Sequence, residues 1–352
     1  MVRKMKTLSY LLLLSLSCFL AAAQNSGKSW KDLAAPEVNG IWLRPAMEQP
    51  ARAVWGHANG IQVGISPMPG PRGLLRVYTP YLGHPEAVMI NYIAVEPIPE
   101  GTEVRGLSEL EMSGLDHLRG KRFWSANDSL ATSPREAESP ARGVISGPEG
   151  NQELSVYIFS EPFQNGAKVY LRLRFYEQKP CEVEISVFKQ TGSVALDHCI
   201  VTATMGNYAR LRTLYLNGKK ESAINLWPDY KGTDFTPHAV FPLKEMIHDQ
   251  KGGAWFVAAT DEKDPEEAQY APGTNDHWKY TGAVAIQYWY CKQPDARLEG
   301  LVNGRNVYWA SKSPIPGGIA FENFEMKEPF RDGAIVVFGV SPSKPERIIG
   351  KL

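Results

Sequence analysis

The densest group of side chains able to do chemistry lies between Arg72 and Glu111. Two carboxylic acids in this stretch, Glu96 and Glu109, are candidates for a catalytic pair that hydrolyses a glycosidic bond. Such a pair acts across a cleft at a separation of roughly 5–9.5 Å. The competing interpretation is that both acids form structural ion pairs with nearby arginines. Four residues could bind the hydroxyl or carboxylate groups of a substrate: Arg72, Arg76, Tyr81 and Arg105.

A second mechanism, β-elimination from a uronic acid, would use a base beside a cation that neutralises the uronate carboxylate. His84 or Tyr280 would be the base and Arg72 the cation. Tyr280 belongs to the motif NDHWKYTG, which also supplies His277 as a catalytic candidate and Trp278 as a ring for sugar stacking. We expect this motif and the first stretch to converge on one concave face, where loops at strand ends hold the ligand.

A non-catalytic alternative uses aromatic rings instead of ionisable groups. The apolar faces of pyranose rings stack on aromatic side chains, so a strip of exposed tryptophans would bind a glycan. Convergent charged residues in a pocket would favour an enzyme, whereas an open aromatic strip would favour a binding protein. Many of the nine tryptophans must belong to the core, and five are candidate platforms: Trp42, Trp55, Trp278, Trp289 and Trp309.

Several other chemistries lack their motifs in this sequence. There is no GxSxG turn, no phosphate loop and no GxGxxG dinucleotide motif. The histidines and cysteines show no HxH, HExxH or CxxC spacing, so we expect no zinc site. The acidic run between Thr260 and Asn275 lacks the spacing of calcium loops, which gives a structural calcium ion little support. No organic cofactor is expected.

The first 23 residues have the pattern of an export signal. Basic residues within positions 3–6 precede an apolar run, Leu11–Leu20, and then the small residues Ala21–Ala23. We expect cleavage before Gln24 and a periplasmic or secreted protein; a lipoprotein anchored through Cys18 is the alternative. The run is shorter than the ~20 apolar residues that span a bilayer, so no membrane span is expected.

The charge balance excludes nucleic acid as a partner. The chain has 38 basic and 38 acidic residues, and the leader takes three of the basic ones, so the mature protein has no basic field. Its three remaining cysteines, Cys181, Cys199 and Cys291, allow at most one internal disulfide. Cys181 and Cys199 could face each other, or all three could be buried thiols.

Short runs rich in β-branched and aromatic residues, separated by Gly, Pro, Asn and Asp, predict an almost entirely β fold. In Lys168–Tyr176 apolar residues alternate with polar and tyrosine residues, and the pair Lys168–Glu177 and Cys181–Gln190 predicts an antiparallel hairpin. The predicted strands are Ile61–Ile65, Leu74–Thr79, Val88–Val95, Leu154–Phe159, Val169–Phe175, Val183–Phe188, Cys199–Met205, Trp255–Ala259, Val284–Tyr290, Asn306–Ala310 and Ile335–Val340.

Helical patterns are few. Leu107–Leu118 has apolar residues near helical spacing, with Ser108 and Glu111 placed as a capping box, and a second short helix is predicted at Pro242–Asp249. Strands without long intervening helices favour an antiparallel β-sandwich or jelly roll, or a packed pair of them. The polar segment 125–151 is expected to be a linker or exposed loop between an N-terminal β region, 24–124, and a C-terminal sandwich region, 152–352.

Five unusual blocks occur together: GPRGLLRVYTPYLGHP, MINYIAVEPIP, RGLSELEMSGLD, TMGNYARLRTLYL and GGIAFENFEM. As a set they resemble a functionally uncharacterised family of exported β-rich proteins from Gram-negative bacteria that degrade polysaccharides. The resemblance covers most of the mature chain and implies a carbohydrate context by association, without a catalytic residue to carry over. We therefore expect an exported carbohydrate-active protein, a glycoside hydrolase or polysaccharide lyase acting on a complex glycan, either neutral or acidic. A non-catalytic glycan-binding or assembly sandwich is the alternative.

Overall fold

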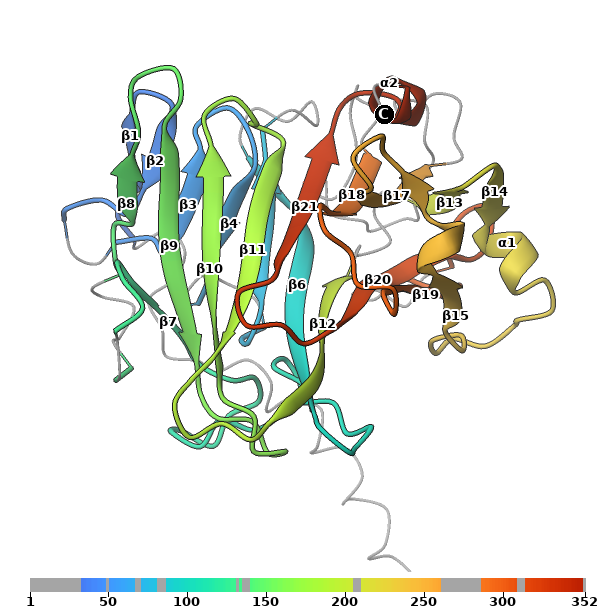
Figure 1. The fold of residues 1–352 in the computed structure, drawn as a ribbon, viewed down its shortest axis with the longest axis horizontal. Helices are drawn as coiled ribbons and strands as arrows, with labels where there is room; N and C mark the ends of the chain where they lie inside the picture. Colours follow the sequence, from blue (N-terminus) through green and yellow to red (C-terminus); the bar gives the residue numbers. More distant parts are fainter. Residues whose placement is uncertain are drawn as a thin grey trace, which may run out of the picture.

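The computed structural model describes residues 33–48, 51–66, 71–80, 87–130, 133–134, 140–204, 210–260, 286–308 and 314–350. Within these ranges the chain forms two antiparallel sheets and very little helix, which confirms the predicted all-β fold (Figure 1).

The first sheet has ten strands in the described residues. In spatial order they are β1 (Glu37–Asn39), β2 (Trp42–Arg44), β3 (Val54–His57), β4 (Gln62–Gly64), β5 (Leu75–Thr79), β6 (Val88–Pro99), β12 (Leu196–Thr204), β20 (Ala320–Pro329), β19 (Glu299–Arg305) and β15 (Ala239–Pro242).

The second sheet has eleven described strands. Nine follow one path, β14 (Lys219–Ser222), β13 (Leu211–Leu216), β17 (Ala254–Thr260), β18 (Ile286–Cys291), β21 (Ile335–Ser341), β11 (Glu182–Lys189), β10 (Val169–Tyr176), β9 (Glu153–Ser160) and β7 (Phe123–Ala126); β16 (Ile247–His248) pairs with β17, and β8 (Val144–Ser146) pairs with β9. Two short helices, α1 (Ala223–Leu226) and α2 (Pro345–Ile349), and the 3₁₀ turn η2 (Leu243–Glu245) complete the described elements.

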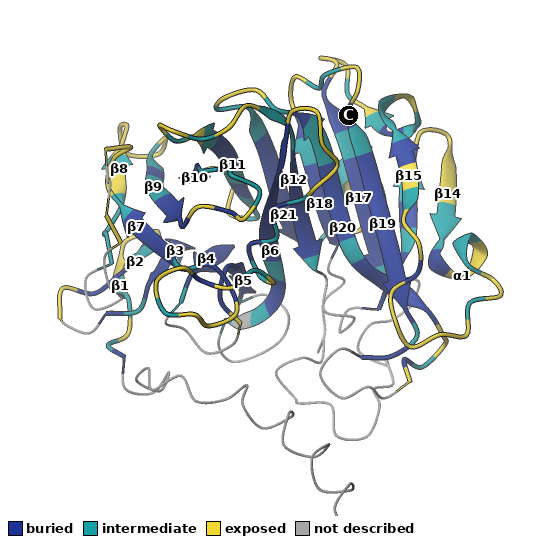
Figure 2. Ribbon diagram, turned by 90° about the horizontal axis from the view of Figure 1, so that it is seen from below, coloured by how far each residue is buried: buried dark blue, intermediate teal, exposed yellow. Residues whose placement is uncertain are grey.

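One hydrophobic core draws its residues from both sheets, as the dark strands of Figure 2 illustrate. On β10 the inward side chains Val169, Leu171, Leu173 and Phe175 are all buried, and the residues between them are half-buried. Burying one such side chain stabilises the fold by about 1.5–3 kcal/mol. A register slip of one residue would turn all four outward, so the alternation determines which face of β10 points inward.

The predicted hairpin is confirmed, because β10 and β11 pair antiparallel from Val169 opposite Lys189 to Arg174 opposite Glu184. Most other predicted strands also lie where the sequence indicated. The prediction of a strand at Asn306–Ala310 differs from the structure where residues are described: β19 ends at Arg305, and of residues 306–308 only Val307 forms a bridge, to Pro314. Residues 309 and 310 lie outside the described residues. Gly300 within β19 obscures the strand in the sequence, yet a Cβ there would lie 2.7 Å from the ring of Phe256.

The predicted helix at Leu107–Leu118 is wrong. Residues 111–120 instead form a small hairpin, in which Ser113 N donates to Leu118 O and Gly120 N to Glu111 O. The carboxylate of Glu161, which follows β9, accepts hydrogen bonds from the backbone amides of Gly114 and Leu115. Because a carboxylate from another part of the chain satisfies these amides, helical hydrogen bonds are not needed there.

The segment predicted as a helix at Pro242–Asp249 contains only the 3₁₀ turn η2, followed by strand β16. The helical turn ends after η2 because the next residues, Ile247 and His248, pair with Trp255 and Ala254 of β17.

Strands from both sides of segment 125–151 belong to the same sheets. β6 pairs with β12 over most of its length, and β7 joins the second sheet beside β9. Within 125–151 the described part also includes β8, which pairs with β9. The regions before and after this segment are therefore joined by strand pairing. The three cysteines in the described residues, Cys181, Cys199 and Cys291, are all free thiols.

Candidate active site

Two carboxylates and one arginine meet on the outer face of the first sheet. Arg105, in the connection after β6, places its Nη1 atom 2.9 Å from Oε2 of Glu96 and 3.2 Å from Oε2 of Glu325. Because both oxygens contact the same nitrogen, the distance between them cannot exceed the sum of these two N···O distances.

Strand register brings the two acids together. On β6, Ile93 and Val95 point into the core, so Glu96 lies on the opposite face. Glu96 is opposite Ile200 of β12, and Glu325 of β20 is opposite Thr202 of the same strand. The two glutamates thus flank β12 diagonally, and Arg105 spans the gap above that strand.

The group continues to the edge of the sheet through His238 and Asn303. His238, just before β15, has Nε2 3.2 Å from Oε1 of Glu325 and 3.4 Å from Nδ2 of Asn303. The register of β19 against β20 shifts between Val302 and Gly304, and Asn303 lies at that irregularity. A bulge of this kind re-aims a side chain, and here it directs Asn303 toward His238.

Burial falls from the carboxylates toward solvent. The side chain of Glu325 is 2% exposed and that of Glu96 11%, whereas Arg105 is 28% and His238 31% exposed. Burial, followed by the nearby charge of Glu325, raises the pKa of Glu96 to about 7, although Arg105 opposes the shift. Burial lowers the pKa of Arg105, but the two glutamates outweigh it and the net shift is upward.

This arrangement has the parts needed for acid–base chemistry. A carboxyl with a pKa near neutrality can donate a proton at physiological pH, and a second carboxylate beside it can act as nucleophile or base. The upper limit on the separation of the two oxygens is compatible with the short carboxyl spacing of roughly 5–5.5 Å in retaining glycosidases.

Arg72 and Arg76, predicted to bind substrate, are both buried and already engaged. Arg72 forms a two-pronged ion pair with Asp116, at 2.5 and 2.9 Å, and donates to the carbonyls of Leu118 and Gly120. Hydrogen bonding from Arg72 holds the pKa of Asp116 well below its usual range. Arg76 is fully buried on β5 and donates to Pro71 O at 2.5 Å.

Glu109 is half-buried and makes no hydrogen bond or ion pair with another described residue. Burial raises the pKa of Glu109, while the charge of Arg119 lowers it. Of the predicted residues, the described contacts join only Glu96 and Arg105. The other predicted site residues, Tyr81, His84, His277, Trp278 and Tyr280, lie outside the described residues, as does the acidic run from 261 onward.

The tryptophans proposed as platforms are core residues wherever the structure describes them. Trp42, Trp55 and Trp289 are at most 1% exposed, so they cannot stack on a sugar; Trp278 and Trp309 lie outside the described residues.

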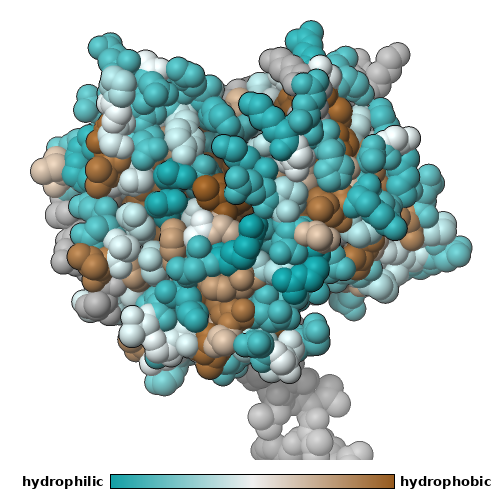
Figure 3. All heavy atoms as spheres, viewed as in Figure 1, coloured by the Kyte–Doolittle hydropathy of each residue, from teal (hydrophilic) through white to brown (hydrophobic). Residues whose placement is uncertain are grey.

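A row of aromatic rings does cross the outer face of the second sheet, from Trp124 through Phe159 and Tyr170 to Phe188. The rings of Phe159 and Tyr170 are 4.9 Å apart and those of Tyr170 and Phe188 5.0 Å apart, both nearly parallel. Their faces therefore cover one another and leave mainly edges for a ligand. Apolar residues in the view of Figure 3 likewise form separate patches broken by polar residues.

Sequence reasoning missed Glu325, His238 and Asn303. A signal for Glu325 exists in GGIAFENFEM, because the apolar positions Phe324 and Met326 assign Glu325 to the opposite face of the strand. Nothing local marks His238, since its partner is 87 residues away.

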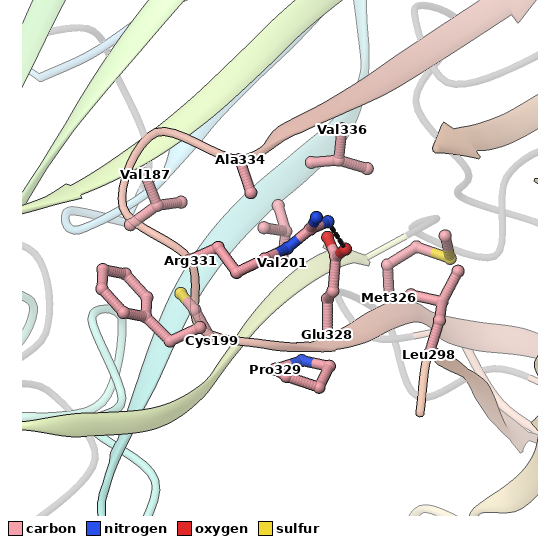
Figure 4. Close-up of a pocket in the computed structure, with 11 residues that line it drawn as sticks. Val187, Cys199, Val201, Leu298, Met326, Glu328, Pro329, Arg331, Ala334 and Val336 are labelled. Atoms are coloured by element: carbon pink, nitrogen blue, oxygen red, sulfur yellow. Dashed lines mark hydrogen bonds and ion pairs between the residues drawn. The ribbon is translucent and has the colours of Figure 1, made fainter. Parts of the chain in front are cut away.

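A separate small cavity lies between the sheets and is lined mostly by apolar side chains (Figure 4). Glu328 and Arg331 form an ion pair at this cavity, and Cys199 contributes its thiol. The space open to the centres of water molecules is about 30 Å³. That is room for only about one or two waters, so the cavity cannot hold a sugar ring.

Comparisons with protein-family models, with curated proteins and with solved structures give no match for this chain. Among the described residues, no three His, Cys, Asp or Glu side chains are placed to hold a metal ion. The described helices also include none with the length and apolar character required to cross a bilayer.

Proposed function

We propose that the protein is an exported glycoside hydrolase in which Glu96 and Glu325 form the catalytic carboxyl pair. The observation that carries this proposal is their shared contact with Nη1 of Arg105 on a face that solvent reaches. Glu96, whose pKa is raised to about 7, would protonate the leaving oxygen, and Glu325 would act as the nucleophile. The export signal and the family resemblance of the sequence support a glycan as substrate.

Hydrolysis is favoured over β-elimination by the state of the arginines. A lyase needs a cation free to neutralise the uronate carboxylate. Arg72 is bound to Asp116, and Arg105 is bound to Glu96 and Glu325. Neither arginine is free to bind a substrate carboxylate, so a linkage between neutral sugars suits the described residues better than a linkage to a uronic acid.

The test is incubation of the mature protein with a panel of neutral and acidic polysaccharides, with reducing ends and unsaturated uronates measured together. We expect reducing ends without unsaturated products. Glu96→Gln should lower the rate by about 100- to 10,000-fold, the usual contribution of a positioned acid or base. Glu325→Gln, which lacks the nucleophile, should lower it at least as much. The short carboxyl spacing further predicts retention at the anomeric carbon, which proton NMR of the first product detects.

Glu328→Gln is the matched control, because Glu328 is also a largely buried, arginine-paired glutamate but lies at the small cavity. It should retain full activity. Unsaturated products would indicate a lyase instead. Glycan binding without any product would indicate the binding protein that the sequence left as the alternative.

A further inference from the structure

Two groups with opposite hydrogen-bonding needs, a donor and a carboxyl oxygen, face the same ring nitrogen of His238. Oδ1 of Asn303 accepts a hydrogen bond from the backbone N–H of Asn323 at 3.0 Å, which fixes the orientation of its amide group. Nδ2 of Asn303 can only donate, and it faces Nε2 of His238 at 3.4 Å. Glu325 presents a carboxyl oxygen to the same Nε2 at 3.2 Å.

Neither protonation state of Nε2 satisfies both neighbours. If Nε2 carries a hydrogen, it can donate to Glu325 but opposes the N–H of Asn303. If Nε2 is bare, it can accept from Asn303 but faces the lone pairs of Glu325, unless Glu325 itself is protonated. A proton at this contact therefore has two positions, one on the imidazole and one on the carboxyl.

We infer that His238 is the proton-exchange partner of Glu325. One proton moves between Oε1 of Glu325 and Nε2 of His238, and the partly exposed imidazole passes it to solvent. In the forward direction the O–H bond of the carboxylic acid breaks, an N–H bond forms, and a neutral imidazole becomes an imidazolium. The imidazolium then releases its Nδ1 proton to water, which restores a neutral ring and leaves Glu325 ionised.

The other charged groups near Glu325 cannot carry its proton to solvent, which leaves His238 as the route. Glu325 is 2% exposed, and among the described residues its other charged contact is Arg105, which neither accepts nor releases a proton at physiological pH. The next charged pair along β20, Lys327 with Glu299 at 3.4 Å, is an ion pair of its own. Glu96 is reached only past Arg105.

The consequence for the site rests on the proposed hydrolase. Glu325 can lose its proton through His238, whereas Glu96 keeps its proton. This separates the two carboxyls into one ionised and one protonated group, as a nucleophile and an acid require.

The experiment reads the proton directly and does not need a substrate. Full-length protein labelled with ¹⁵N-histidine is titrated from pH 5 to 8, with the His238 signals assigned by their loss in His238→Gln. We expect the Nε2 chemical shift, which reports the tautomer of the ring, to change in Glu325→Gln, while Glu299→Gln leaves it unchanged. The same Nε2 chemical shift in wild type and Glu325→Gln throughout the pH range would overturn the inference.

If Glu325→Gln does not fold, the carboxyl carbon of Glu325 in ¹³C-labelled protein reads the same proton. Its titration should move in His238→Gln, and an unmoved curve would count against the exchange. Once a substrate is found, the pH–rate profile of His238→Gln should differ from that of wild type in its acidic limb. The NMR result stands even if no polysaccharide is hydrolysed, so failure of the proposed function and failure of this inference are distinguishable.

Discussion

Asn91 on β6 and Gln287 on β18, 196 positions apart in the sequence, share a 2.5 Å hydrogen bond between the two sheets. Nδ2 of Asn91 donates to Oε1 of Gln287, and both side chains are at most 1% exposed. The amide nitrogen of Gln287 has no hydrogen-bond partner in the described structure. A buried polar contact of this kind ties the register of one sheet to the other.

Removing both partners of this pair should cost less than the two single removals added together. Asn91→Leu leaves the Gln287 carbonyl buried without a donor, which should lower the free energy of unfolding by about 1–3 kcal/mol. The double variant Asn91→Leu/Gln287→Leu should lose less than the sum of the single changes, with a coupling of about 1 kcal/mol in urea unfolding. Simple additivity would show that the contact contributes nothing specific.

Arg72 should behave as a structural residue. Arg72→Ala removes a buried guanidinium from Asp116 and from three backbone carbonyls, so we expect a loss of about 2–4 kcal/mol in stability. Arg297→Ala, at an ion pair whose arginine is 65% exposed, is the control and should cost no more than about 1 kcal/mol. A stable Arg72→Ala protein that has lost glycan binding would restore the sequence-based assignment of Arg72 to the substrate site.

Glu161 should be essential to the hairpin at 111–120. Its buried carboxylate accepts from the hydroxyl of Ser113 and from the amides of Gly114, Leu115 and Arg122. Glu161→Gln replaces one acceptor oxygen by a donor, and we expect a loss of about 2–4 kcal/mol in urea unfolding. Earlier proteolytic cleavage within residues 111–120 should accompany it. The exposed Glu149→Gln should have no effect on either measurement.

The raised pKa of Glu96 makes stability fall as pH rises. Its carboxyl titrates near 4.5 when unfolded and near 7 when folded, so the folded state binds the proton more tightly. The stabilisation from this preference is complete below about pH 4.5 and is lost as pH rises through about 7. Its size is about 2–4 kcal/mol, at 1.36 kcal/mol per pH unit.

Glu96→Gln is neutral throughout and should therefore gain stability relative to wild type between pH 5 and pH 8. Thermal unfolding at a series of pH values measures this difference. Glu149→Gln should run parallel to wild type. A constant offset between Glu96→Gln and wild type would mean that Glu96 stays ionised in the folded protein.

The three described thiols should differ in reactivity. Burial raises the pKa of both the Cys199 and the Cys291 thiols to about 12, so few thiolates form there at pH 8. Cys181 is half-buried and should react first with a thiol reagent, while the other two should react only on unfolding. Mass mapping of the labelled cysteines checks the order. A disulfide found by non-reducing mapping would contradict the structure.

Local sequence patterns correctly predicted the strands that bury one face in the core. The alternation in β10 and the short turn before β11 predicted a hairpin that forms at the expected register, because the same residues supply both the core contacts and the pairing. The pattern at Leu107–Leu118 failed, because its apolar spacing is helical while its amides are satisfied by Glu161, far away in sequence. A capping-box motif reports only on its own four residues and cannot reveal that a distant carboxylate accepts hydrogen bonds from the amides that follow.

The sequence by itself determined that this chain would be almost entirely β, since burial at every second residue is a property of a strand alone. It also singled out Glu96 and Arg105 as residues able to do chemistry. Only the tertiary structure decided that Glu325 joins them and that His238 in turn contacts Glu325, because β12 lies between β6 and β20 and brings Arg105 and Glu325 together although they are more than 200 positions apart. A carboxylate acquires an unusual pKa from what surrounds it after folding, and strand order in space, which no local pattern encodes, decides those surroundings.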